Sequence, residues 1–235
     1  MRIRRGPRGG RAPSGRRLWR QWLLWATAGE MAGFAAPAVV GAATADGPTA
    51  LTVTGLVAAG AVEGAVLGLA QARVLRRVWP RLDGGRWTAA TAAAAAFAWL
   101  LGLLPSALHD AVADWPVPVL AALAAVAGPL LLVSVGTAQW WVLRRHVPRA
   151  RRWIAGSAAG WLLGLLVFTA LTSPLWRPGQ PAPLVGLIGL LGGTAMAFTA
   201  AAVTGWVLVR LAAEQAPAAG GSRDTTGPGR APRRP

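Results

Sequence analysis

The chain of 235 residues is 54% hydrophobic and only 14% charged, and its formal net charge is +16. It contains no cysteine, which excludes disulfides and thiolate metal sites. Apolar stretches of about 20 residues each occupy most of its length, so no segment remains to form a separate soluble core. The chain is therefore predicted to be an all-α polytopic membrane protein.

Six transmembrane helices are predicted, joined by short connections. Each apolar stretch is long enough to cross about 30 Å of hydrocarbon at about 1.5 Å per residue. In chain order the spans cover residues 21–43, 50–72, 88–108, 118–143, 153–173 and 183–209. The membrane domain then extends over 20–211, between a disordered basic tail over 1–19 and a disordered tail over 212–235.

Two motifs recur along the chain and predict that the helices come in pairs. Gln-x-x-Val-Leu-Arg-Arg begins at Gln71 and again at Gln139, and Trp-Leu-Leu-Gly-Leu-Leu begins at Trp99 and again at Trp161. Self-similarity of this kind is typical of repeat architectures. We predict three tandem two-helix repeats, over residues 20–77, 86–145 and 152–210. The third copy is degraded, with Thr204 where the other two have glutamine.

The arginines predict the orientation in the membrane. All 24 basic residues are arginine, and only Arg177 lies outside the two tails and the second and fourth connections. The opposite connections carry Asp46, Asp110 and Asp114. This positive-inside pattern predicts that both termini are cytoplasmic. Because the chain lacks lysine and is rich in Ala, Arg, Gly and Pro, we expect a bacterial source and therefore the bacterial inner (cell) membrane.

Aromatic and basic residues near the helix ends are predicted to anchor the protein at the lipid headgroups. An indole prefers the headgroup level, and a guanidinium reaches lipid phosphate. The predicted lipid-facing anchors are Trp22, Trp87, Trp153, Arg76, Arg77, Arg144 and Arg145. Anionic lipids are therefore the expected partners, and no nucleic acid is expected.

Small and amide residues inside the spans predict contacts between helices. Glycines four residues apart allow helix backbones to approach closely, and they occur as Gly29, Gly33, Gly60, Gly64, Gly68, Gly156, Gly160 and Gly164. They form either packing within the chain or a seam between copies in a homo-oligomer. Gln71 and Gln139, about one turn inside the arginine boundary, are expected to hydrogen-bond between helices.

Two carboxylates, Glu30 and Glu63, lie inside the apolar runs, each ten residues from an arginine. Ten residues of helix span about 15 Å, so both acids lie near the bilayer midplane on adjacent helices. An ionised carboxylate there costs several kcal/mol, and we expect at least one acid to be protonated at neutral pH. The pair suits a proton relay or a cation site. It equally suits neutral acids hydrogen-bonded to a partner helix, for instance to Thr27, Thr52 or Gln71.

No other cluster predicts a chemical activity. His109, Asp110 and Asp114 lack a fourth ligand and are interpreted as a solvated loop, so no metal and no cofactor are predicted. The sequence has no nucleotide-binding loop, zinc-protease motif, serine elbow or cysteine nucleophile. An enzyme is therefore not expected.

The stretches Gly29–Pro37 and Gln139–Arg145 resemble uncharacterised multi-pass membrane proteins of actinobacteria and cyanobacteria. The resemblance covers the six helices but not the tails, and it implies no known activity. The sequence favours a non-enzymatic structural or partner-binding membrane component, as a homo-oligomer or beside a partner subunit. The alternative is a proton- or cation-coupled small-solute transporter or channel that uses Glu30 and Glu63.

Overall fold

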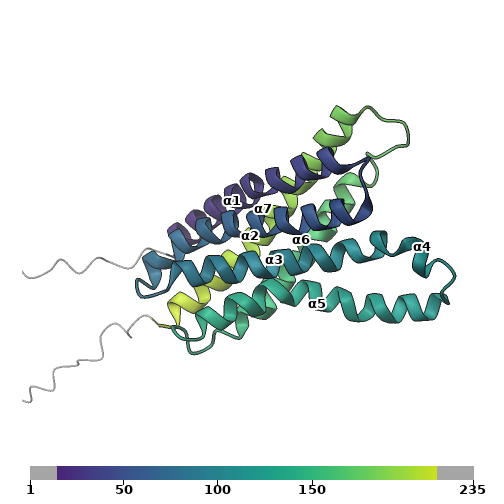
Figure 1. Cartoon of the computed structure of the whole chain (residues 1–235). Helices are drawn as coiled ribbons and strands as arrows, with labels where there is room; N and C mark the ends of the chain where they lie inside the picture. Colours follow the sequence, from purple (N-terminus) through teal and green to yellow (C-terminus); the bar gives the residue numbers. More distant parts are fainter. Residues whose placement is uncertain (1–14, 216–235) are drawn as a thin grey trace, which may run out of the picture.

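The computed structural model describes residues 15–215, which fold entirely into helices and their connections. The helices are α1 (Gly15–Thr44), α2 (Thr49–Val78), α3 (Gly84–Ala107), α4 (His109–Val112), α5 (Val117–Leu143), α6 (Arg152–Thr172) and α7 (Ala182–Ala213) (Figure 1). All except the short α4 are long and apolar enough to cross a membrane, which makes 6 candidate spans within the described residues. The prediction of an all-α polytopic membrane protein is confirmed.

The first helix begins earlier than the sequence predicts. The tail predicted over 1–19 is wrong for residues 15–19, which belong to α1. Tertiary contacts explain the longer helix, because Leu18 is buried and the Trp19 indole donates a 3.0 Å hydrogen bond to the carbonyl of Ala202 on α7. Residues 1–14 and 216–235 lie outside the described residues, and so does the prediction that they are disordered.

The six long helices form a closed ring. Each packs mainly against two neighbours, in the order α1, α2, α3, α5, α6, α7 and back to α1. Consecutive helices therefore form three hairpins, α1–α2, α3–α5 and α6–α7. The contact between α7 and α1 joins the last hairpin to the first.

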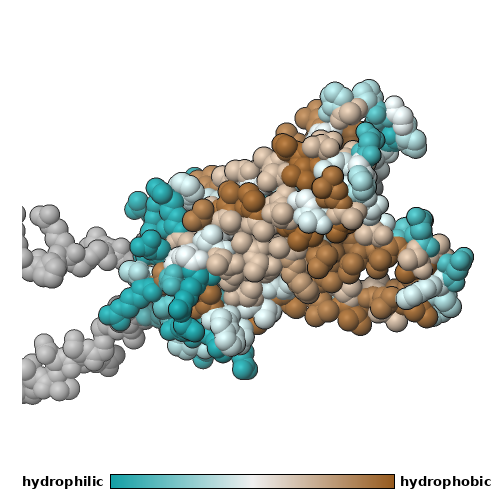
Figure 2. All heavy atoms as spheres, in the orientation of Figure 1, coloured by the Kyte–Doolittle hydropathy of each residue, from teal (hydrophilic) through white to brown (hydrophobic). Residues whose placement is uncertain are grey.

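The charged connections gather at one end of the ring, which we call the arginine-rich end. It contains the start of α1, the α2–α3 and α5–α6 connections and the end of α7, at the left of Figure 1. Figure 2 shows hydrophilic residues at both ends and hydrophobic residues over the middle of the visible face. This distribution is what a bilayer requires, with polar groups at the headgroups and apolar groups in the hydrocarbon.

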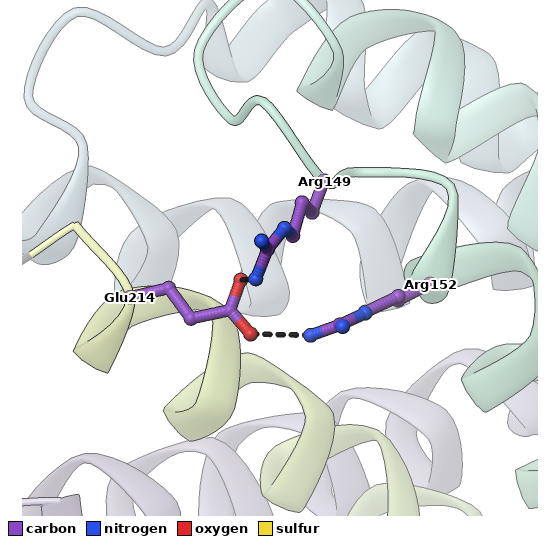
Figure 3. Close-up of polar contacts among 3 residues, drawn as sticks. All are labelled: Arg149, Arg152 and Glu214. Carbon is purple, nitrogen blue, oxygen red and sulfur yellow. Dashed lines mark hydrogen bonds and ion pairs between the residues drawn. The ribbon is translucent and has the colours of Figure 1, made fainter.

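The end of α7 is fastened to the α5–α6 connection at the arginine-rich end. The Glu214 carboxylate pairs with Arg149 at 3.5 Å and also with Arg152 (Figure 3). The neighbouring Gln215 accepts a hydrogen bond from the Trp79 indole and donates one of 2.9 Å to the carbonyl of His146. These contacts join the end of α7 to the α2–α3 connection as well as to the α5–α6 connection.

Packing is tight at the arginine-rich end and loose at the opposite, wide end. On α3 the buried residues are Trp87, Thr91 and Ala94, all in its first half. On α5 no residue before Val135 is buried. Figure 1 shows the far ends of α3 and α5, with α4, diverging from the α6–α7 connection. The ring therefore encloses a core at one end and open space toward the other.

The eight spaced glycines all lie against another helix of the same chain. Gly29 and Gly33 face α2, whereas the three on α2 (Gly60, Gly64, Gly68) face α3 and the three on α6 (Gly156, Gly160, Gly164) face α7. A Cβ on Gly33 would lie 2.8 Å from the carbonyl oxygen of Glu63, which is too close for a real side chain. The absence of side chains at these positions lets the backbones approach, so these glycines serve packing within the chain.

Candidate functional site: an acid pair in a central cavity

Three tryptophans meet at the centre of the ring. Trp22, Trp87 and Trp153 have relative exposures of 0%, 0% and 1%, so the prediction that they are lipid-facing anchors is wrong. The ring centroid of Trp153 lies 5.5 Å from that of Trp22 and 5.7 Å from that of Trp87, in edge-to-face geometry. Edge-to-face packing of large aromatic groups stabilises a buried core.

Burial of these indoles is possible because each N–H finds an acceptor on the second helix of the neighbouring hairpin. The three hydrogen bonds are Trp87 to Gln71 at 3.1 Å, Trp153 to Gln139 at 2.9 Å and Trp22 to Thr204 at 2.9 Å. The three acceptors occupy matching positions in the aligned motifs, so Thr204 supplies a hydroxyl oxygen where the others supply an amide oxygen. A buried indole without an acceptor would cost about 1–3 kcal/mol.

The two glutamines, which the sequence predicts to hydrogen-bond between helices, also bond to each other between α2 and α5. The Gln139 side-chain nitrogen donates to the Gln71 side-chain oxygen at 2.9 Å and to the Thr91 hydroxyl at 3.0 Å. We call the set Trp22, Trp87, Trp153, Gln71, Gln139 and Thr204 the tryptophan layer. It fills the ring just inside the arginine-rich end.

The tryptophans that face outward at this end differ from those expected, whereas the arginines do not. Trp141 and Trp206 are 54% and 55% exposed, and they take the position predicted for the buried tryptophans. The guanidinium of Arg144 stacks on Trp141 at 3.5 Å and that of Arg210 on Trp206 at 4.5 Å. The predicted anchors Arg76, Arg77, Arg144 and Arg145 are all exposed. Their guanidinium groups are therefore accessible to lipid headgroups.

The acid pair lies deeper in the bundle. Glu30 follows Trp22 by eight residues and Glu63 precedes Gln71 by eight, which places both acids about 12 Å beyond the tryptophan layer. Their relative exposures are 6% and 8%. Both acids line the same cavity, and their helices approach closely where Gly33 lies against the backbone of Glu63, as the sequence predicts for acids on adjacent helices.

The two acids differ in their partners. The Trp99 indole donates a 2.7 Å hydrogen bond to Oε2 of Glu63. Within the described residues, Oε2 of Glu30 is buried and has no hydrogen-bond partner. The partners suggested by the sequence are wrong. Within the described residues the Thr27 hydroxyl has no hydrogen-bond partner, the Thr52 hydroxyl donates to the Thr44 carbonyl, and the Gln71 side-chain oxygen accepts from Trp87.

A cavity of about 340 Å³ opens beside the acid pair and is lined by all six long helices. One residue from each helix lies at matching depth, eight residues from the tryptophan layer. This set, the acid layer, is Glu30, Glu63, Ala95, Leu131, Trp161 and Met196. One turn further from the arginine-rich end the lining continues with Phe34, Trp99 and Leu165. The cavity is therefore apolar and aromatic except at the acids and Thr91.

A second, smaller space lies between the two layers. Its volume is about 30 Å³, and its polar lining comes from Glu30, Gln71, Gln139, Ser157 and Thr204. A space of this size with several polar partners can hold about two water molecules. Because Glu30 lines both spaces, it stands between the apolar cavity and the polar chamber.

Trp99 and Trp161 were not assigned to the site from the sequence, although a signal for them existed. Both begin the repeated Trp-Leu-Leu-Gly-Leu-Leu motif, and both line the cavity. The motif differs by four residues in register between copies, so Trp99 lies one turn from the acid layer whereas Trp161 belongs to it. Sequence repetition marked these residues but did not place them beside the acids.

Within residues 15–215 no group of three or more His, Cys, Asp or Glu side chains could hold a metal ion. His109, Asp110 and Asp114 lie at the wide end, away from the cavity lining. No protein-family model, curated protein or solved structure matches the chain. The resemblance to multi-pass membrane proteins of actinobacteria and cyanobacteria stays a prediction, and the geometry of the cavity carries the functional argument.

Proposed function

We propose that the protein is a proton- or cation-coupled transporter of a small solute, with Glu30 and Glu63 as the coupling groups. One observation carries the proposal: Oε2 of Glu30 is buried and has no protein partner within the described residues, and Glu30 is among the residues that line the cavity. A buried carboxyl group is costly in the membrane interior, and such residues commonly mark ion and substrate pathways. A proton or a cation is the ligand that would satisfy this oxygen.

The arrangement around the acids supports transport. The cavity lies toward the wide end, whereas the tryptophan layer closes the arginine-rich end. A site open toward one side and sealed toward the other corresponds to one state of alternating access. Passage to the other side requires the polar chamber and the tryptophan layer to open, which breaks hydrogen bonds between neighbouring hairpins. The acids exchange protons or cations in this scheme and form no covalent bond to the solute, so the function is not enzymatic.

We further propose that the three hairpins are repeats related by rotation about an axis along the membrane normal. The matching hydrogen bonds of the tryptophan layer support this arrangement, because each joins one hairpin to the next in the same sense. Parallel repeats about such an axis build several transporter folds, and motion of one repeat against the others changes access to the centre.

The proposed location is the bacterial cell membrane, with the arginine-rich end and both termini in the cytoplasm. Exposed arginines at this end support contact with anionic lipid, at about 1 kcal/mol for each residue near the surface. The cavity would then face away from the cytoplasm.

A structural or partner-binding component is the second candidate, and the sequence favoured it. It is supported by α5, where no side chain before Val135 is buried, so a helix of another subunit has room to pack there. The unpartnered oxygen of Glu30 places transport ahead of this structural role, because a purely structural acid would be expected to have a hydrogen-bond partner.

The test is flux in reconstituted vesicles that contain a pH-sensitive dye, across a broad solute screen. Glu30→Gln and Glu63→Gln keep the side-chain shape but remove titration, and both are expected to fold and to abolish proton-coupled flux. Glu214→Gln makes the same chemical change outside the cavity and should keep full flux. No flux from the wild type, together with normal behaviour of both glutamine variants in cells, would reject transport.

A further inference from the structure

We infer that the cavity binds a hydrophobic amine in its protonated, singly charged form, with the ammonium group on Glu30. This inference rests on the proposed function and adds the class of substrate. It combines the unpartnered Oε2 of Glu30 with the aromatic lining of the cavity.

The charge of the site favours a monocation. Two carboxyl groups that line one cavity inside a membrane do not both ionise, so the pair holds one negative charge at most. Trp99 already donates to Oε2 of Glu63, whereas Oε2 of Glu30 has no donor within the described residues. The site thus offers one negative charge and, on a residue that lines the cavity, one buried acceptor oxygen without a donor. An ammonium group supplies one positive charge and the N–H donor that this oxygen lacks.

The lining disfavours a bare metal ion. A dehydrated hard cation such as Ca²⁺ takes 6–8 oxygen ligands. Besides the two acids, the only oxygen-bearing side chain in the lining is that of Thr91, and its hydroxyl is engaged with the Trp87 carbonyl and with Gln139. A metal ion at Glu30 would therefore lack most of its ligands, whereas an ammonium group has three N–H donors at most, and aromatic faces can stabilise the part of its charge that no oxygen reaches.

The remaining lining fits an apolar body. Phe34, Trp99 and Trp161 surround the space together with leucine, alanine and methionine side chains. Aromatic faces attract a cation placed over them, and indole does so best. A volume of about 340 Å³ lies within the range of small-molecule sites. The same group of residues therefore accommodates both the charge and the hydrophobic part of the ligand.

Binding and proton release are linked by charge balance. When both carboxyl groups are protonated, the site is neutral before binding. Entry of one ammonium ion then requires the loss of one proton from Glu30, so that the occupied site is again neutral. One cation enters for one proton released, and no oxidation or covalent step is involved.

The test is titration calorimetry on the full chain in lipid nanodiscs, with 2-phenylethylamine as probe and 2-phenylethanol as a neutral compound of matched shape. The amine is expected to bind at least tenfold more tightly than the alcohol. Glu30→Gln should reduce amine affinity at least tenfold and leave alcohol binding unchanged, whereas Glu214→Gln should change neither. In buffers of different ionisation heat, amine binding should release up to one proton.

A second measurement keeps the inference testable if Glu30→Gln fails to fold. Amine binding by the wild type should weaken as the pH is lowered, because protons compete with the ammonium group for the carboxylate, and alcohol binding should not respond. Equal affinity for amine and alcohol would overturn the inference, because the charge of the ammonium group would then contribute nothing to binding. Amine affinity unchanged in both glutamine variants would overturn it as well.

The outcomes separate this inference from transport itself. Amine binding that depends on Glu30, without flux in vesicles, would reject transport and keep the ligand class. Proton-coupled flux of another solute, without amine binding, would reject the ligand class and keep transport.

Discussion

The indole nitrogen of Trp22 lies 2.9 Å from the hydroxyl oxygen of Thr204, across a separation of 182 residues. This buried hydrogen bond joins the first long helix to the last and closes the ring. It corresponds to the bonds from Trp87 and Trp153 to their glutamines, with a hydroxyl in place of an amide. The contact between chain ends is therefore of the same kind as the contacts between consecutive hairpins.

Removal of the Thr204 hydroxyl should destabilise the ring. Thr204→Val leaves the Trp22 N–H buried without an acceptor, and the expected cost is about 1–3 kcal/mol in the free energy of unfolding. Thr199→Val is the matched control, because within the described residues the Thr199 hydroxyl bonds only to the Ala195 carbonyl of its own helix, at 2.8 Å. Chemical unfolding in detergent micelles measures both. Equal stability of the two variants would contradict a role for this bond in closure.

Substitution of Gly33 should separate the two acids. In Gly33→Ala the new Cβ would lie 2.8 Å from the carbonyl oxygen and 2.9 Å from the Cα of Glu63, both of them backbone atoms. Such overpacking typically costs about 1–3 kcal/mol. Gly41→Ala, on the same helix, would meet only a leucine methyl group at 3.7 Å and should be tolerated. Unfolding in micelles compares the two, and a stable Gly33→Ala variant would show that the helices separate easily.

Lipid access should distinguish the outward-facing tryptophans from the buried ones. Brominated lipids quench indoles that touch acyl chains, so Trp141→Phe and Trp206→Phe should each reduce the quenchable part of the fluorescence. Trp153→Phe should leave that part unchanged, because Trp153 is 1% exposed. The folded state of each variant is checked by gel filtration. Loss of quenching in Trp153→Phe would mean that lipid enters the tryptophan layer.

The orientation is tested with alkaline phosphatase fused after Asp46, Asp83, Asp114 or Arg149. The enzyme is active only outside the cytoplasm, so fusions after Asp46 and Asp114 should be active and the other two inactive. This outcome follows from the arginines that flank the α2–α3 and α5–α6 connections. Activity after Asp83 or Arg149 would reverse the proposed orientation.

The Glu214 ion pairs should contribute little to stability. The side chains of Arg152 and Glu214 are 58% and 32% exposed, and exposed pairs are worth about 0–1 kcal/mol. Glu214→Gln should therefore lower the free energy of unfolding by less than about 1 kcal/mol, and the difference should shrink in high salt. A larger loss in micelles would indicate that the end of α7 is essential to closure.

The spans and the acid pair could be predicted from the sequence because both depend on features along one chain. Apolar length identifies a helix that crosses hydrocarbon, and ten residues from an arginine give Glu30 and Glu63 the same depth. The two helices are consecutive and joined by a short connection, so their contact follows almost directly. The pairing of the carboxyl groups needed no knowledge of the remaining four helices.

The burial of Trp22, Trp87 and Trp153 could not be predicted in this way. A tryptophan near the end of a span suits the headgroup region, and it also suits a core that offers its N–H an acceptor. The choice depends on residues of another hairpin, and hence on the order of helices around the ring. Trp99 was missed for the same reason, because its acceptor on Glu63 lies 36 residues away on a neighbouring helix.

The two layers of the ring place different demands on the sequence. In the tryptophan layer every side chain is matched to a neighbour, so a change at one position needs a compatible residue on the next hairpin, as Thr204 provides for Trp22. In the acid layer the side chains face open space, and alanine, leucine, methionine and tryptophan stand where the first hairpin has its acids. A ring of this kind can acquire a new chemical specificity by single substitutions in the acid layer, while the hydrogen bonds of the tryptophan layer continue to hold its hairpins together.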